Sequence, residues 1–119
     1  MIERTVSEQL DFAILSVVSA YPDGEHQDYW AAWRSAVERK FPKLIFTDND
    51  LRFSFEHLGS LDLEITKPDT QQKQATKYSP AMSQGLSEID SRTFFMTGPF
   101  NAKITRDGAR YLNRLKNAQ

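Results

Sequence analysis

The chain has 119 residues, with 15 Lys and Arg against 16 Asp and Glu, 39% apolar residues and no Cys. This length suits one domain, and the composition excludes a disulfide scaffold, a collagen-like repeat and wholesale disorder. The lack of Cys also excludes Cys-ligated zinc, iron–sulfur clusters and a thiolate nucleophile.

Charge is divided unevenly along the chain. Residues 1–66 carry six basic and twelve acidic side chains, whereas residues 67–119 carry nine basic and four acidic ones. Such asymmetry either steers a partner or is neutralised when the two halves fold against each other. The first residues lack the basic start and apolar core of a signal peptide, and the longest apolar run, 12–18, is too short to cross a membrane. We therefore expect a cytoplasmic protein.

Two helices are expected in the first third of the chain. A one-sided apolar stripe predicts the first helix, which Ser7 would cap and the Pro-Asp-Gly turn at 22–24 would end. The members of this stripe are Leu10, Ile14, Val17, Val18 and Tyr21. A second stripe predicts a helix over 26–41 that stops before Pro42. Its members are Trp30, Trp33, Val37 and Phe41. We expect both Trp residues to belong to the core.

The segment 51–65 fits two structures. One is a helix over 48–58, with Thr47 or Asp48 as its N-cap and Gly59 as its stop, followed by a strand over 61–66. The other is a hairpin, because residues 51–56 also alternate as a half-buried strand does and residues 59–60 could turn the chain. We expect the helix followed by the strand.

The rest of the chain predicts an α+β fold. Residues 67–92 form an irregular polar insert, in which a helix over 80–90 is a weaker expectation. Two strands follow at 93–97 and 100–104, joined by a Gly-Pro turn, and Thr105 would cap a last helix over 106–117. The expected fold therefore has three N-terminal helices, a short antiparallel sheet and a C-terminal helix.

The closing segment, from Ile104 to Leu112, resembles that of winged helix domains of the MarR and PadR sort. In that family a strand ends in a Leu/Ile-Thr pair, and the helix after it opens with two residues, a Gly and a basic or bulky stretch ending in Leu. Here Gly108 would let the first helical turn pack closely. Residues 51–65 are similar to the family's recognition helix and first wing strand. The resemblance implies one winged helix-like domain over 1–119, DNA binding and a homodimer, with Tyr111, Leu115 and the first helix as candidates for the dimer interface.

The third helix would supply the contacts that read a DNA sequence. Arg52, Ser54 and His57 are the base-edge candidates, because Arg pairs bidentately with guanine. Three acidic residues on the same helix oppose this function, since carboxylates that face phosphates weaken binding. They are Asp48, Asp50 and Glu56.

Two basic sets are candidates for phosphate contacts. The first lies in the insert, where it would follow a DNA backbone as an extended wing does. It comprises Lys67, Lys73, Lys77 and Arg92. The second is a stripe at i, i+4 and i+8 on the last helix, which faces phosphates, an acidic partner or solvent. It comprises Arg106, Arg110 and Arg114.

The leading hypothesis is a small transcriptional regulator that binds double-stranded DNA as a homodimer. The alternative is a protein–protein interaction module on the same fold without DNA binding, which the acidic third helix and the long polar insert favour. A weaker third option is an enzyme or ligand sensor with a pocket lined by Tyr29, Trp30 and Trp33. We expect no catalysis, cofactor or metal, because no nucleotide or hydrolase motif is present and His26 with Asp28 supplies too few ligands.

Overall fold

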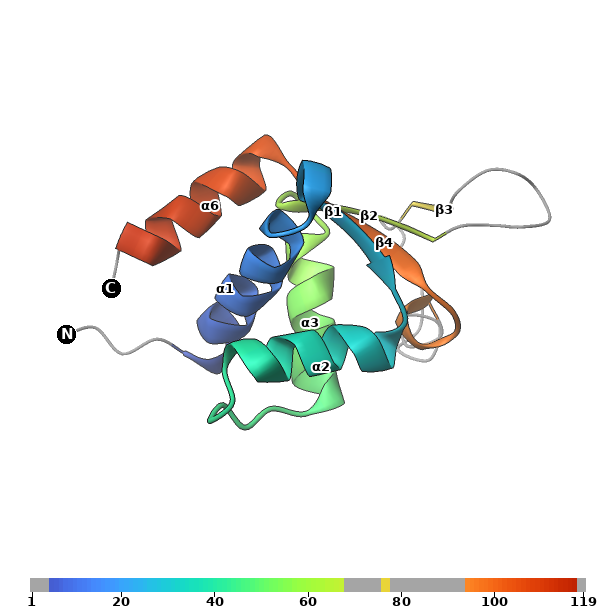
Figure 1. The fold of residues 1–119 in the computed structure, drawn as a ribbon, viewed down its shortest axis with the longest axis horizontal. Helices are drawn as coiled ribbons and strands as arrows, with labels where there is room; N and C mark the ends of the chain where they lie inside the picture. The colour runs from blue at the N-terminus through green and yellow to red at the C-terminus, as the bar shows by residue number, and fades with distance from the viewer. Residues whose placement is uncertain (1–4, 68–75, 78–93, 118–119) are drawn as a thin grey trace.

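The computed structural model describes residues 5–67, 76–77 and 94–117. The protein consists of helices packed beside an antiparallel sheet (Figure 1). In chain order the elements are α1 (Val6–Ser19), η1 (Pro22–Gly24), β1 (Glu25–Asp28), α2 (Trp30–Lys40), α3 (Asp48–Leu58), β2 (Leu63–Lys67), β3 (Thr76–Lys77), β4 (Phe100–Ile104) and α6 (Arg106–Asn117). The fold class is α+β, as predicted, with three N-terminal helices, an antiparallel sheet and a C-terminal helix.

The sheet has the strand order β1-β4-β2-β3, and all of its neighbours are antiparallel. The register places Leu63 opposite Ile104 and Ile65 opposite Ala102. Helices α1, α2 and α3 gather beside this sheet, and α6 packs on α1 at the edge of the molecule (Figure 1). Among the described elements α1 is therefore central, since it contacts α2, α3, α6 and the sheet.

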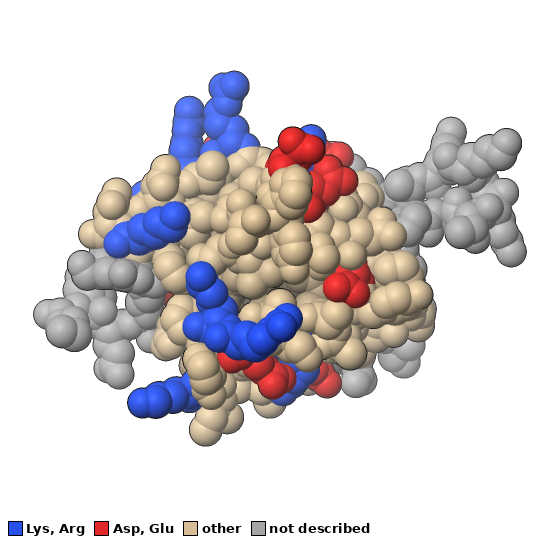
Figure 2. Space-filling model, in the orientation of Figure 1, with Lys and Arg blue, Asp and Glu red and all other residues tan. Residues whose placement is uncertain are grey.

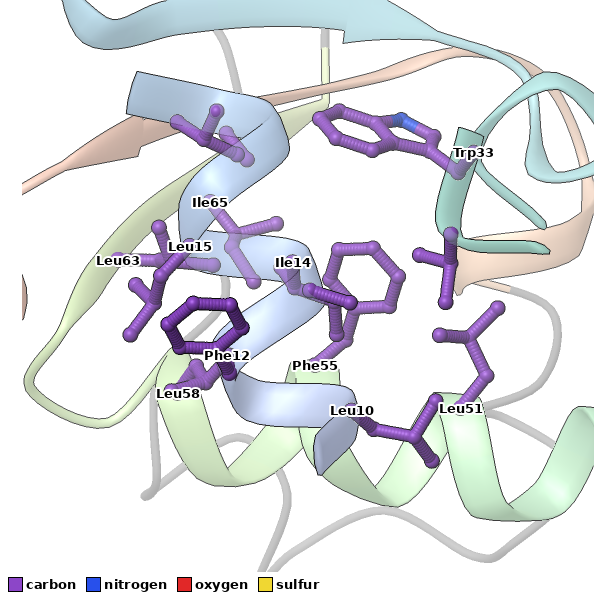
Figure 3. Packing of buried hydrophobic residues seen from close by; sticks show 14 of the residues in the cluster. Leu10, Phe12, Ile14, Leu15, Trp33, Leu51, Phe55, Leu58, Leu63 and Ile65 are labelled. Carbon is purple, nitrogen blue, oxygen red and sulfur yellow. The ribbon is translucent and has the colours of Figure 1, made fainter. Parts of the chain in front are cut away.

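Aromatic and aliphatic side chains from the three N-terminal helices and the sheet meet in one core (Figure 3). Leu10 and Ile14 of α1 lie beside Phe55 of α3, and all three are fully buried. The ring of Trp33 stacks on Phe100 at 5.4 Å and meets Phe55 edge-on at 5.5 Å. Each such buried side chain stabilises the fold by about 1.5–3 kcal/mol. The expectation that Trp33 belongs to the core is confirmed.

The start of α6 is fixed by a close approach between its first turn and the turn after α3. Thr105 Oγ1 accepts a hydrogen bond from the Gly108 N–H at 3.0 Å, and the Thr105 N–H donates to the Asp62 carbonyl at 3.0 Å. A Cβ atom at Gly108 would lie only 2.1 Å from the same carbonyl oxygen. The predicted roles of Thr105 as a cap and of Gly108 as a close-packing residue are confirmed.

Three expectations are corrected by the structure. The N-cap of α1 is Thr5 rather than Ser7, because Thr5 Oγ1 accepts from the Glu8 N–H at 3.1 Å. The predicted helix over 26–41 divides into β1 and α2, because residues 25–28 pair with β4. Residues 94–96 are helical instead of extended, and Phe94 and Phe95 are both buried there.

Of the two structures predicted for residues 51–65, the protein has the helix followed by a strand, not the hairpin. The helix over 48–58 is confirmed, and the strand after it begins at Leu63, two residues later than predicted. The predicted helix over 80–90 and most of the insert over 67–92 lie outside the described residues. Of the insert, the structure describes the end of β2 at Lys67 and the short strand β3, which pairs with it.

Candidate functional site

The position of α3 is set by hydrogen bonds at its first turn. Thr47 Oγ1 accepts from the Asp50 N–H at 3.1 Å, and Asp50 Oδ2 accepts from the Thr47 N–H at 2.9 Å, which together form a capping box. The next carboxylate, Asp48, accepts from Trp30 Nε1 at 3.2 Å and pairs with the guanidinium of Arg34. These contacts link the start of α3 to α2.

Two of the three base-edge candidates face the interior. Arg52 is 1% exposed and Ser54 is 2% exposed, so neither side chain can reach a duplex docked on α3. The Arg52 guanidinium donates to Asn49 Oδ1 at 3.4 Å and lies 5.0 Å from the centre of the Phe53 ring. The prediction that these two side chains contact bases is wrong because it took the residue types into account but not their positions around the helix. Arg52 and Ser54 lie next to Leu51 and Phe55 and share their buried side of α3.

The outward face of α3 carries a large apolar side chain and no cation. Phe53 is 55% exposed, the His57 side chain is 61% exposed, and Asn49 is exposed as well. Arg52 is the only Lys or Arg among the residues of this fully described helix. The surface that would enter a DNA groove is therefore apolar and acidic in character.

A groove runs between this face and the first two turns of α1. It has a volume of about 380 Å³ and is lined by Val6, Ser7, Leu10, Asp50, Phe53, Ser54 and His57. Val6 and Phe53 form exposed apolar edges, at 42% and 55% exposure, and Leu10 is buried. The sequence signal for this groove was weak, because Phe53 lies off the apolar stripe of α3 and resembles an ordinary surface residue.

A polar junction, made of Asp11, His57, Asp62 and Tyr111, lies where α1, α3 and α6 meet. Tyr111 Oη donates to Asp11 Oδ2 at 2.8 Å, and His57 Nε2 lies 3.8 Å from the same oxygen. Asp11 is 2% exposed, and its Oδ1 atom is buried without a hydrogen-bond partner among the described residues. This junction was not predicted, although a carboxylate between the apolar residues Leu10 and Phe12 was a usable signal.

Burial governs the titration of this polar junction. It raises the pKa of the Asp11 carboxyl above its ordinary value of 3.8, while the Tyr111 hydrogen bond and the nearby His57 oppose the rise. The pKa of Asp62 is raised in the same way, mainly by burial. Burial and the bond to Asp11 also raise the pKa of Tyr111. The junction therefore holds carboxyl groups that favour the neutral form more than exposed ones do.

The predicted basic stripe on α6 is solvent-exposed along its whole length. Arg106, Arg110 and Arg114 are all exposed, and blue side chains project from the edge of the molecule over α6 (Figure 2). Arg110 lies 4.0 Å from Asp107, and Arg114 lies 5.4 Å from the centre of the Tyr111 ring. These contacts are weak and leave the positive charge open to an anionic partner.

The residues expected at a dimer interface are engaged within the chain. Tyr111 bonds to Asp11 of α1, and Leu115 is 7% exposed on the side of α6 that packs on α1. The stripe and these two residues thus occupy different faces of one helix.

The insert candidates are only partly covered by the structure. Lys73 and Arg92 lie outside the described residues. Lys77 lies in β3, opposite Thr66 of β2, and Lys67 lies opposite Thr76. Lys77 therefore belongs to the edge strand of the sheet, whereas Lys67 ends the strand next to it.

The other sequence candidates do not converge on a reaction centre. His26 Nε2 lies 3.1 Å from Asp28 Oδ2, and its ring stacks on Tyr21 at 3.7 Å. Within the part of the chain that the structure describes, no three metal-ligating side chains come together. Trp33 is 1% exposed in the core whereas Tyr29 is 60% exposed, so these two of the residues suggested for a pocket do not share one surface. Among the described segments, none of the helices has the length and apolar character needed to cross a membrane.

The chain matches no protein-family model, no curated protein and no solved structure. Its function is therefore inferred from its own geometry.

Proposed function

We propose that this chain is a winged helix-type binding module of the cytoplasm, and that α3 docks a protein partner rather than the major groove of DNA. Support for the architecture comes from the helix order and from the antiparallel pair β2 and β4, which follows α3 where the resemblance puts the wing. The Thr105 cap and the close approach at Gly108 give a physical reason for the resembling segment.

The observation that carries the proposal is the outward face of α3. DNA affinity rests largely on cations that neutralise phosphates, and base reading rests on donors at the helix surface. Here the one arginine of α3 is buried, Asp48 and Asp50 lie at the helix start, and Phe53 is exposed. Phe53 shares its groove with a second exposed apolar side chain, Val6, and apolar surface that rims a groove is a feature of protein-interaction sites.

A second candidate function, DNA binding as a homodimer, is favoured by the basic stripe on α6. Three exposed arginines at i, i+4 and i+8 are suited to phosphate contacts, and Lys77 on the sheet edge is a candidate to add to them. Contacts of this kind are independent of sequence and fall steeply with salt.

Fluorescence anisotropy with a mixed-sequence duplex, titrated at low salt, separates these two functions. The proposal predicts that Asn49→Ala and His57→Ala change any low-salt affinity by less than about twofold, since α3 makes no DNA contact. Replacing Arg106, Arg110 and Arg114 by Gln is expected to remove that affinity. A drop of about tenfold or more in the α3 variants would assign α3 to DNA and overturn the proposal.

A further inference from the structure

The groove between α1 and α3 has the features of a binding site for one apolar side chain. Its buried end is formed by Leu10, and its edges are the exposed side chains of Val6 and Phe53. Its volume of about 380 Å³ lies within the range of roughly 300–1,000 Å³ that ligand pockets span. Covering Val6 and Phe53 would remove apolar surface from water at a place where the described part of the chain does not do so.

The charges around the groove define what can flank that side chain. Asp50 lines the groove at the first turn of α3. Among the described residues that line it, none is Lys or Arg. An ion pair of this kind is present next to the groove, because Asp48, at the same helix start, pairs with the guanidinium of Arg34. A cationic group beside Asp50 would be attracted, whereas an anionic one would be repelled.

We propose that the α1–α3 groove binds a peptide segment of a partner protein that places one aliphatic or aromatic residue between Phe53 and Val6 and carries Lys or Arg beside it. This inference rests on the proposed function and specifies its partner class. The apolar anchor supplies affinity through burial, and the cationic flank, facing Asp50, sets the orientation of the segment.

The test is selection from a random peptide library displayed on phage, with the folded wild-type chain as bait and Phe53→Ser as the counter-selection bait. Phe53 is 55% exposed, so its replacement leaves the core intact. Leu61→Ser is the matched control, because Leu61 is 60% exposed and does not line the groove. Circular dichroism and denaturation midpoints verify that all three baits are folded.

The expected result is a set of peptides with a Leu, Ile, Met or Phe next to Lys or Arg. A synthetic representative should bind about tenfold or more weakly to Phe53→Ser, and unchanged to Leu61→Ser. Asp50→Asn should weaken it by about two- to fivefold, and Asp107→Asn on α6 should have no effect.

Two results would overturn the inference and differ in what else they imply. Selected peptides that depend on Phe53 but carry Asp or Glu flanks would refute the cationic partner class and leave protein docking by α3 standing. Absence of any Phe53-dependent peptide would refute the groove as a docking site. If, in addition, Asn49→Ala and His57→Ala lower the affinity for DNA, the proposed function is wrong too.

Discussion

Helices α3 and α6 expose opposite kinds of surface, although both begin at a capping Thr and both bury a leucine-containing face. The first buries its only arginine and exposes Phe53, whereas the second exposes three arginines in a row. Helical phase, rather than composition, therefore decides which charges a partner meets. A partner that needs cations would be drawn to α6, and one that needs an apolar contact to α3.

The two faces of α3 itself can be separated by a pair of truncations. Phe55→Ala should cost roughly 3–5 kcal/mol in the free energy of unfolding, because Phe55 is fully buried against Trp33 and Phe100. Phe53→Ala, two residues away and exposed, should change it by less than about 0.5 kcal/mol. Urea denaturation of both variants measures the difference. Equal effects would show that Phe53 is a core residue.

The start of α6 can be broken by filling the space at Gly108. Gly108→Val should cost roughly 3 kcal/mol, because even the first side-chain atom would lie 2.1 Å from the Asp62 carbonyl oxygen. Ala109→Val, at the neighbouring exposed position, should cost less than about 1 kcal/mol as a helix-propensity effect. Thermal unfolding of the two variants compares them. Wild-type stability for Gly108→Val would contradict the close packing.

The polar junction depends on the Tyr111 hydroxyl. Tyr111→Phe should cost roughly 1–2 kcal/mol, because it leaves the buried Asp11 carboxylate without this donor. The same change should raise the pKa of Asp11 further, since the hydrogen bond lowers it. Chemical denaturation gives the first quantity, and an NMR titration of the carboxyl group gives the second. An unchanged or lower Asp11 pKa would refute the assigned bond.

The pH dependence of stability follows from the raised pKa values of Asp11 and Asp62. A folded-state pKa above the unfolded value means that the neutral carboxyl is favoured by folding. This contribution is fully present below the ordinary value of 3.8 and disappears as the pH rises through the raised folded pKa. Denaturation from pH 3.5 upward should show a smaller decrease with rising pH for Asp11→Asn than for wild type. Parallel curves would show that Asp11 does not contribute.

The stripe on α6 should matter least for stability. Replacing Arg106, Arg110 and Arg114 by Gln should change the free energy of unfolding by less than about 0.5 kcal/mol per site, because these side chains are exposed. If the stripe binds phosphates, the slope of log affinity against log salt should fall by about 0.9 for each phosphate that the protein no longer neutralises. An unchanged slope would show that the stripe on α6 does not contact DNA phosphates.

Local signals predicted much of this fold. The Thr and Gly at the ends of α3, the Thr-x-x-Gly start of α6 and the apolar stripe of α1 act within a few residues, so they are visible in the sequence. Strand β1 was missed because its four residues have no apolar alternation and are held by pairing with β4. The strand predicted over 93–97 is wrong at 94–96, which are helical, because burial of both Phe94 and Phe95 depends on packing from other elements.

The candidate site was less predictable than the fold. Of the three base-edge candidates, His57 is exposed, whereas Arg52 and Ser54 are buried. The groove needs α1 and α3 side by side, and the bond from Tyr111 to Asp11 joins residues 100 positions apart. No local pattern encodes such distant contacts.

Whether α3 contacts DNA can be seen in ¹H–¹⁵N NMR spectra of the chain titrated with duplex DNA at low salt. If α3 makes no such contact, the amide signals of Asn49, Phe53 and His57 stay in place, and any shifts gather on α6. Shifts centred on those three residues of α3, saturating with DNA, would contradict the proposed function.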